Sequence, residues 1–306
     1  MSQSSLSNGT RRSPLRHGEY LQDDVALFSR WLAERLSGQP IDFAIAGYPA
    51  AYPTLQDALN DYNWPPRKIS ALVDSAMDVY RYPVSIVDLP GRSGIVVNSQ
   101  MLKQLQRALH DAYSRGNTAN FELAGAVAAI LNWGGVYTTV WKTKGNKPWL
   151  AANHLGLYDL LKAVVQDHAR GEDQSRITDL RFNSGMTKVY SLLIDDFIIY
   201  DSRVAAALAW LVITWWRTSR KQSDDSLPLA LRFGCLPANG KGGAFRNPQR
   251  LLFPTLRSCP ARHYTWNMRA NWLLGDALKQ AGSASHFSSL RDIEAALFQM
   301  GARVSA

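Results

Sequence analysis

Lys188 and Asp201 are thirteen positions apart in the stretch SGMTKVYSLLIDDFIIYDSRVAAAL, and the run between them is largely apolar. The turn-forming residues 183–185, in which Gly185 permits an unusual backbone angle, place Lys188 in the first turn of a predicted helix. Asp201 directly precedes a long apolar run, so it is predicted to cap the next helix, whose N-terminus stabilises a carboxylate. The same dipole effect at the start of a helix disfavours the charged form of Lys188. A nucleophilic lysine must be in its neutral form, so this effect is in the required direction. The pair can therefore supply a fixed anion and a nucleophile; the simpler interpretation is a helix cap and a solvated or phosphate-binding lysine.

The elements around this pair are expected to be mostly helical. Apolar residues recur at three- and four-residue steps, the period of an amphipathic helix, and few segments alternate with period two. The helical pattern covers residues 21–36, 69–80, 100–113, 121–131, 155–168, 187–193, 203–216, 266–280 and 290–300, and extended stretches are expected near 84–88, 94–97 and 137–141. The predicted fold class is mainly α, with two helical lobes between which the chain crosses and a few short strands. We expect a mobile basic tail over residues 1–20, an N-terminal helical region over 21–130 and a second helical region over 131–306.

Composition favours a globular protein with an anionic partner. The chain has 306 residues, 46% of them apolar, and ten tryptophans, which suffices for a packed core. Its net charge of +9 favours nucleic acid or an anionic membrane as the partner. The apolar run 204–216 is thirteen residues long, whereas a bilayer span needs about 20, so we expect a buried helix and no membrane. Two cysteines and no export-signal pattern lead us to expect a cytoplasmic protein with reduced thiols.

The positive charge is concentrated in one segment. Residues 226–275 contain no Asp or Glu, yet they contain Arg232, Lys241, Arg246, Arg250, Arg257, Arg262 and Arg269. Glycines 240, 242 and 243 and several aromatic residues lie in the same segment, and this combination fits phosphate contact with base stacking. The segment therefore predicts a nucleic-acid interface, although a solvated basic face that keeps the protein soluble would have the same composition.

Several cofactor sites are not supported by the sequence. The string GCLPANGKGG has the wrong spacing for a phosphate-binding loop, and glycine follows Lys241 where a magnesium-binding hydroxyl is required. The six histidines include no close pair at metal-ligand spacing. We therefore expect neither a nucleotide cofactor nor a metal.

With these elements in place, the sequence resembles the helix-hairpin-helix DNA glycosylase superfamily. SGMTK is similar to the hairpin that carries the catalytic lysine of that family, and IIYDSRV is similar to its aspartate signature. The later strings WNMRANWLL and LRDIEAALFQMG resemble bacterial proteins with an 8-oxoguanine DNA glycosylase fold, including members that act in anti-phage defence. This closer resemblance covers roughly residues 131–301. Two departures stand out, because the spacing between Lys188 and Asp201 is shorter than usual in the family and Gly185 stands alone where the hairpin usually has two glycines.

The resemblance implies a DNA glycosylase in which Asp201 and Lys188 are catalytic. A fixed carboxylate stabilises the oxocarbenium character that develops at C1′, and a neutral lysine can attack C1′ to form a Schiff base. The expected partner is double-stranded DNA, bound by a monomer without a cofactor. The implied substrate is a modified base, including glucosylated hydroxymethylcytosine of phage DNA. The alternatives are an 8-oxoguanine repair glycosylase with lyase activity and a non-catalytic nucleic-acid-binding protein.

Two further sets of candidate residues follow. A glycosylase extrudes its target base into a pocket, where aromatic and polar side chains hold it. Candidates to line that pocket are Asn132, Trp133, Trp141, His263, Trp266 and Asn267. For Trp133, in the string NWGG, a helix C-terminus with a buried indole is an equally good interpretation. Candidate DNA contacts are Gly185, Arg203 and the basic residues of 226–275 named above.

Overall fold

The computed structural model describes residues 13–41, 52–63, 94–139, 144–236, 246–256 and 259–304, and over these residues the protein is mainly helical. The helices are α1 (His17–Tyr20), α2 (Asp23–Leu36), α3 (Leu55–Asn60), α5 (Ile95–Ser114), α6 (Asn120–Trp133), α7 (Asn146–Asn153), α8 (Leu157–Ala169), α9 (Met186–Leu193), α10 (Ser202–Thr218), α11 (Pro260–Ala281) and α12 (Leu290–Gly301). Short 3-10 turns are η1 (Gly116–Ala119), η2 (His154–Gly156), η3 (Asp224–Ser226), η4 (Leu229–Leu231) and η5 (Gly282–Ala284). The mainly α fold class is thus confirmed.

Strands are nearly absent from the described part of the chain. Isolated bridges that join described residues pair Arg16 with Glu172 and Cys235 with Thr255. The extended stretch expected at 94–97 is wrong, because Gly94 caps α5 and the next residues form its first turn. The β-branched residues there continue into a helical apolar pattern, and burial of that face outweighs their local preference. The expected elements 69–80 and 84–88 lie outside the described residues, as do residues 140 and 141.

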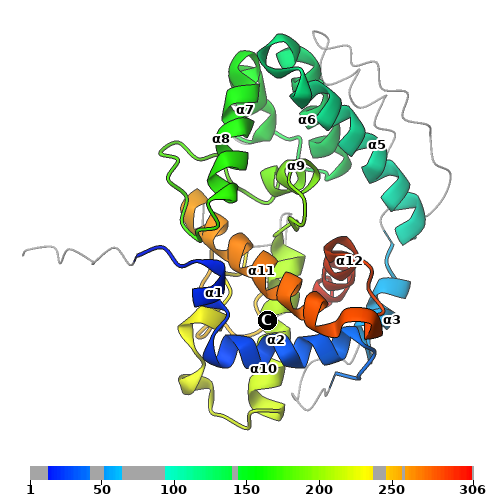
Figure 1. The fold of residues 1–306 in the computed structure, drawn as a ribbon, viewed down its shortest axis with the longest axis vertical. Helices are drawn as coiled ribbons and strands as arrows, with labels where there is room; N and C mark the ends of the chain where they lie inside the picture. Colours follow the sequence, from blue (N-terminus) through cyan, green and yellow to red (C-terminus); the bar gives the residue numbers. More distant parts are fainter. Residues whose placement is uncertain are drawn as a thin grey trace, which may run out of the picture.

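One group of helices packs around α10. Every residue of α10 from Val204 to Trp216 is buried, so this helix is apolar all round and forms the centre of the group. Helix α12 packs against α10 and α3, and α11 packs against α2. Figure 1 shows this group in the lower half of the molecule. Its hydrophobic cluster also includes Leu227, Phe233, Phe253 and Val304.

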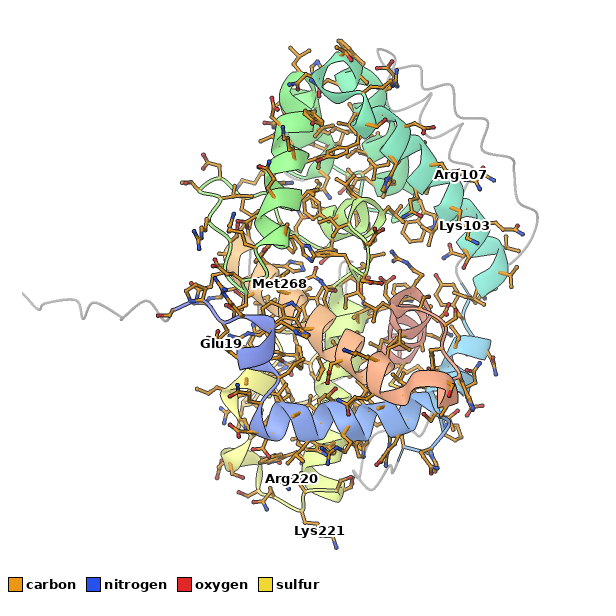
Figure 2. All side chains as sticks on the ribbon, in the orientation of Figure 1. Glu19, Lys103, Arg107, Arg220, Lys221 and Met268 are labelled. Atoms are coloured by element: carbon orange, nitrogen blue, oxygen red, sulfur yellow. The ribbon has the colours of Figure 1, made fainter. Side chains whose placement is uncertain are left out.

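A second group contains α5, α6, α7, α8 and α9, in the upper half of Figure 1. Helix α6 is buried from Leu123 to Trp133 and packs against α5, α8 and α9. Tyr264 and Met268 of α11 join this second cluster from the first group of helices. Met268 lies where the two groups meet (Figure 2).

Followed through its described residues, the chain changes cluster twice. The buried residues from Tyr20 to Tyr62 belong to the first cluster and those of α5 to α9 to the second. Those of α10 to α12 belong to the first again, apart from Tyr264 and Met268. The expected regional boundary at residues 130 and 131 falls inside α6.

The second crossing is the extended segment 197–200. Phe197 and Ile199 lie in the second cluster, and Ile198 and Tyr200 lie in the first. Successive side chains of an extended chain point to opposite sides, so each side of this segment faces one of the two cores. This explains why the sequence FIIY is apolar throughout.

The expectation of a mobile tail over residues 1–20 is incorrect for residues 13–20. The backbone of Leu15 bonds to Asp173, with its N–H donating to Oδ1 at 2.8 Å and its carbonyl accepting from the Asp173 N–H at 2.9 Å. Tyr20 at the end of α1 is buried, and its hydroxyl donates to the Ala230 carbonyl at 3.1 Å. Burial and long-range hydrogen bonds hold this stretch in place. None of the helices in the described part of the chain is both long and apolar enough to span a bilayer.

Candidate active site

Lys188 and Asp201 meet in space. The Lys188 Nζ atom lies 3.8 Å from Asp201 Oδ2, and the two side chains are only 6% and 13% exposed. Helix α9 supplies the lysine from its first turn, and the residue before α10 supplies the aspartate. The apolar segment between them crosses from one core to the other, and this crossing brings the two charges together.

The two carboxylate oxygens of Asp201 have different roles. Oδ1 accepts hydrogen bonds from the backbone N–H groups of Arg203 at 2.9 Å and Val204 at 3.1 Å, so the predicted helix cap is confirmed. Oδ2 faces Lys188 instead. The cap fixes the position of the carboxylate and leaves one oxygen to act on a bound group.

The Lys188 ammonium is held in a buried position. Its Nζ donates a hydrogen bond to the Ser184 carbonyl at 3.0 Å. Burial lowers the pKa of Lys188 below its ordinary 10.5, and the nearby carboxylates of Asp201 and Glu294 offset part of this effect. A lowered lysine pKa makes the neutral, nucleophilic amine more available.

The turn before α9 is organised by two asparagines. Asn183 Oδ1 accepts hydrogen bonds from the backbone N–H groups of Gly185 at 2.8 Å and Met186 at 2.9 Å. Gly185 has ordinary helical angles, φ −74° and ψ −52°, so the expectation of an unusual backbone angle is wrong. Glycine is required here for space, because a Cβ would collide with the Asn146 amide, with Asn146 Cγ at 3.1 Å.

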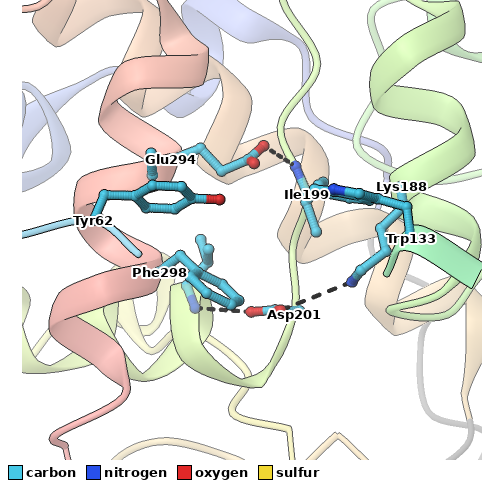
Figure 3. A pocket seen from close by; sticks show the side chains of 9 residues that line it. Tyr62, Trp133, Lys188, Ile199, Asp201, Glu294 and Phe298 are labelled. Carbon is cyan, nitrogen blue, oxygen red and sulfur yellow. Dashed lines mark hydrogen bonds and ion pairs between the residues drawn. The ribbon is translucent and has the colours of Figure 1, made fainter. Parts of the chain in front are cut away.

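A pocket surrounds the Lys188–Asp201 pair where the two groups of helices meet (Figure 3). Its empty space, including the open mouth, is about 320 Å³. Aromatic walls and a small number of polar groups are typical of ligand sites. The lining residues are Tyr62, Trp133, Lys188, Ile199, Asp201, Val204, Glu294, Ala295 and Phe298.

Glu294 on α12 is a functional candidate that the sequence analysis missed. It is buried, its Oε2 accepts from the Ile199 N–H at 2.6 Å, and Arg291 donates to both of its oxygens at 2.8 and 2.7 Å. Burial raises the pKa of this carboxyl, although Arg291 opposes the shift. Arg291 also donates to the Ser191 carbonyl of α9 at 2.9 Å. The Arg291–Glu294 pair therefore ties α12 both to the lysine helix and to the segment that leads to Asp201.

Helix α11 holds the same segment from the other side. His263 Nε2 donates to the Tyr200 carbonyl at 2.7 Å, and Asn267 Nδ2 donates to the Ile198 carbonyl at 3.2 Å. Asn271 Oδ1 accepts from the Ile198 N–H at 2.9 Å. These residues are spaced four apart, so they share one helix face. They satisfy the backbone of a segment that pairs with no strand among the described residues. His263 and Asn267, expected to line the pocket, are buried behind this segment and position it.

The other pocket candidates are distributed differently. Trp133 lines the pocket, and its indole N–H donates to Asn98 Oδ1 at 3.1 Å. Asn132 is buried and is not among the lining residues. Trp266 packs against Phe233, with ring centroids 5.4 Å apart, and is also away from the pocket. Trp141 lies outside the described residues.

The candidate DNA-binding residues fall into distinct environments. Arg246 Nη1 donates to Ser202 Oγ at 2.9 Å, next to Arg203 and Asp201, whereas Arg262 and Arg250 are exposed. Arg269 instead forms a buried ion pair with Asp173 at 2.6 Å. Arg232 donates to the carbonyls of Leu227 at 2.8 Å and Asp225 at 3.3 Å. Lys241 and Arg257 lie outside the described residues. The basic segment thus contains both surface arginines and structural ones.

Within the described ranges, no cluster of three or more His, Cys, Asp or Glu side chains could hold a metal ion. The chain matches no protein-family model, no curated protein and no solved structure.

Proposed function

We propose that this protein is a DNA glycosylase that cleaves the N-glycosidic bond of a modified base in double-stranded DNA, acting as a cytoplasmic monomer. One observation carries the proposal. A lysine whose pKa is lowered by burial lies 3.8 Å from a carboxylate that is fixed by a helix cap, inside an aromatic-walled pocket. A nucleophilic amine beside a fixed anion is the pair that such chemistry requires.

The resemblance to helix-hairpin-helix glycosylases supports the same conclusion. It rests on the turn before α9, on Lys188 in the first turn of α9 and on Asp201 at the start of α10. The connection from α8 to α9 spans residues 170–185, which is longer than a tight hairpin. The proposed similarity to the helix-hairpin-helix motif therefore includes the turn before α9, α9 itself and Asp201, but not a tight connection from α8.

In the proposed reaction the base leaves with the electron pair of the C1′–N bond. Oxocarbenium character develops at C1′, and Asp201 Oδ2 stabilises it without a change in protonation. With water as the nucleophile, a C1′–O bond forms, the departing base takes up the proton that water loses, and the product is an abasic site. With the neutral Lys188 amine, a C1′–N bond forms instead and the nitrogen loses a proton to the departing base. The C1′–O4′ bond then breaks and O4′ takes up a second proton from the nitrogen, which gives a Schiff base.

The proposed substrate class is a modified base, with glucosylated hydroxymethylcytosine of phage DNA first and 8-oxoguanine as the alternative. Polar and aromatic groups around the pocket suit either ring. The exposed arginines of the basic segment support DNA as the partner, since they can neutralise phosphates.

The decisive experiment incubates the protein with duplexes that contain unmodified bases, 8-oxoguanine or glucosylated 5-hydroxymethylcytosine, and then measures abasic sites. We expect abasic sites in one modified duplex. Asp201→Asn should abolish excision with DNA binding and folding retained, because asparagine is an equally good helix cap. Tight binding without abasic sites in any duplex would instead identify a non-catalytic DNA-binding protein.

Borohydride trapping separates the two mechanisms. If Lys188 attacks C1′, reduction captures a covalent protein–DNA adduct that Lys188→Ala eliminates. Abasic sites without an adduct would assign the attack to water and restrict Lys188 to an electrostatic role.

A further inference from the structure

A chain of buried hydrogen bonds connects the two groups of helices beside the pocket. Trp133 of α6 donates from Nε1 to Asn98 Oδ1 at 3.1 Å, and Asn98 of α5 donates from Nδ2 to the Tyr62 hydroxyl oxygen at 3.0 Å. Asn98 is 3% exposed and Tyr62 is 7% exposed. Water therefore has little access to this chain, and each polar group depends on its protein partners.

The donor and acceptor roles in this chain are fixed by chemistry. An indole nitrogen can only donate, so the Asn98 atom facing Trp133 must be the carbonyl oxygen. The Asn98 amide nitrogen then faces Tyr62 and can only donate, which makes the Tyr62 oxygen the acceptor. The hydrogen of the Tyr62 hydroxyl must consequently point away from Asn98.

That hydrogen has no acceptor in the described part of the protein. Tyr62 lies just after α3 and lines the pocket, and its hydroxyl points across the pocket towards Trp133 (Figure 3). Glu294 lies nearby, but its oxygens accept from Arg291 and from the Ile199 N–H, and the Tyr62 hydroxyl forms no hydrogen bond with them. A buried hydroxyl donor without an acceptor is unfavourable. A ligand that supplies an acceptor removes this cost and therefore binds more tightly.

Burial keeps this hydroxyl in its donor form. The pKa of Tyr62 is raised above its ordinary value by desolvation and then by the Glu294 carboxylate, so the phenol stays protonated over the working pH range. The pocket thus presents one oriented neutral donor opposite the Lys188–Asp201 pair.

We propose that Tyr62 recognises the substrate, its O–H donating a hydrogen bond to an acceptor atom on the edge of a heteroaromatic ring bound in the pocket. The inference rests on the proposed function for the source of that ring, a base extruded from DNA. The expected ligand is a ring that has a carbonyl oxygen or an unprotonated ring nitrogen on the edge facing Tyr62. Asn98 is a positioning residue, because it acts only by orienting the hydroxyl.

Two conservative substitutions test this role. Tyr62→Phe removes the donor and retains the ring. Asn98→Asp retains the shape but replaces the donating amide with an acceptor, so the Tyr62 hydrogen turns towards the new carboxylate and away from the pocket. Tyr113→Phe on α5 is the matched control, since Tyr113 packs against Tyr158 in the second cluster and does not line the pocket.

The measurement compares duplexes that cannot be cleaved. One set carries glucosylated 5-hydroxymethylcytosine or 8-oxoguanine on a 2′-fluorinated arabinose, and the other carries a tetrahydrofuran abasic analogue. The ratio of the two affinities isolates the contribution of the base. We expect Tyr62→Phe and Asn98→Asp to reduce this ratio roughly tenfold, as for one lost hydrogen bond, with abasic binding unchanged. Tyr113→Phe should leave both affinities unchanged.

The outcomes separate this inference from the proposed function. Unchanged affinity ratios in both variants would overturn the role of Tyr62. The role would also be overturned if the wild-type protein bound the base-bearing duplexes no more tightly than the abasic duplex. If the ratio falls as expected but the wild type releases no base from cleavable DNA, the recognition site stands and the glycosylase proposal fails. Unchanged abasic binding shows that each variant is folded.

Discussion

Gly134 lies directly against the aliphatic stem of Lys188. A Cβ atom at position 134 would come within 2.6 Å of Lys188 Cε and still closer to Cδ. The backbone of Gly134 has ordinary angles, φ −72° and ψ −6°, so its small size rather than its conformational freedom is required. The end of α6 thus sets how the lysine side chain approaches Asp201.

Gly134→Ala should therefore impair catalysis without altering any group that reacts. The added methyl group displaces the Lys188 stem and moves Nζ from its position 3.8 Å from Asp201 Oδ2. A misplacement of about 1 Å near reacting groups lowers rates by roughly 100-fold. Single-turnover excision and borohydride trapping should both fall by a factor of this order.

Gly275→Ala is the matched control for that substitution. Gly275 lies within α11, and a Cβ there would meet nothing within 4 Å. Alanine is favoured over glycine in a helix by about 0.5–1 kcal/mol, so this variant should be slightly more stable and fully active. Wild-type excision by Gly134→Ala would show that the position of Lys188 does not matter.

The pH dependence of trapping should report the environment of Lys188. In the proposed lysine mechanism only the neutral amine attacks C1′, so the trapping rate should rise with pH through the pKa of Lys188. Burial places that rise below the ordinary value of 10.5. Glu294 favours the ammonium, so Glu294→Gln should move the midpoint to lower pH while its amide oxygen still accepts the Ile199 N–H. A midpoint that moves to higher pH would contradict this electrostatic account.

The sequence predicted the parts of the site that depend on local pattern. Asp201 directly before an apolar run identified a helix cap, and the turn before Lys188 identified a helix start, since capping involves residues within one turn of each other. These two predictions located the central pair of the pocket.

The remaining site residues depend on contacts between distant segments. Tyr62, Asn98 and Trp133 form one hydrogen-bonded chain, yet they lie in separate elements, and no local pattern relates them. Glu294 did have a local signal, because a carboxylate at this position lies on the apolar face of α12 beside Ile293 and Leu297. An acidic residue on a buried helix face is unusual and could have identified it.

His263 should make stability depend on pH in the acid range. Burial lowers its pKa from 6.5 to about 4, so between these values the unfolded chain binds a proton that the folded protein does not. The free energy of unfolding therefore decreases as the pH is lowered from 6.5 to 4. At 1.36 kcal/mol for each pKa unit, the decrease is about 3 kcal/mol.

Urea unfolding of the wild type and His263→Gln at several pH values measures this contribution. Glutamine can still donate to the Tyr200 carbonyl but does not titrate, so the acid-induced loss should be smaller in the variant. Parallel curves for the two proteins between pH 6.5 and 4 would show that His263 is not the responsible group.

The basic segment should separate into arginines that bind DNA and one that stabilises the fold. Arg262 is exposed and Arg246 lies beside the start of α10, so Arg262→Gln and Arg246→Gln should each reduce the slope of log affinity against log salt by about 0.9, the value of one phosphate contact. Arg269→Gln leaves Asp173 buried without its ion-pair partner, so it should lower the free energy of unfolding by about 3 kcal/mol and leave the slope unchanged. Salt titrations of DNA binding, paired with urea unfolding of the same variants, measure both quantities. A reduced salt slope in Arg269→Gln together with unchanged slopes in the other two would reverse the assignment.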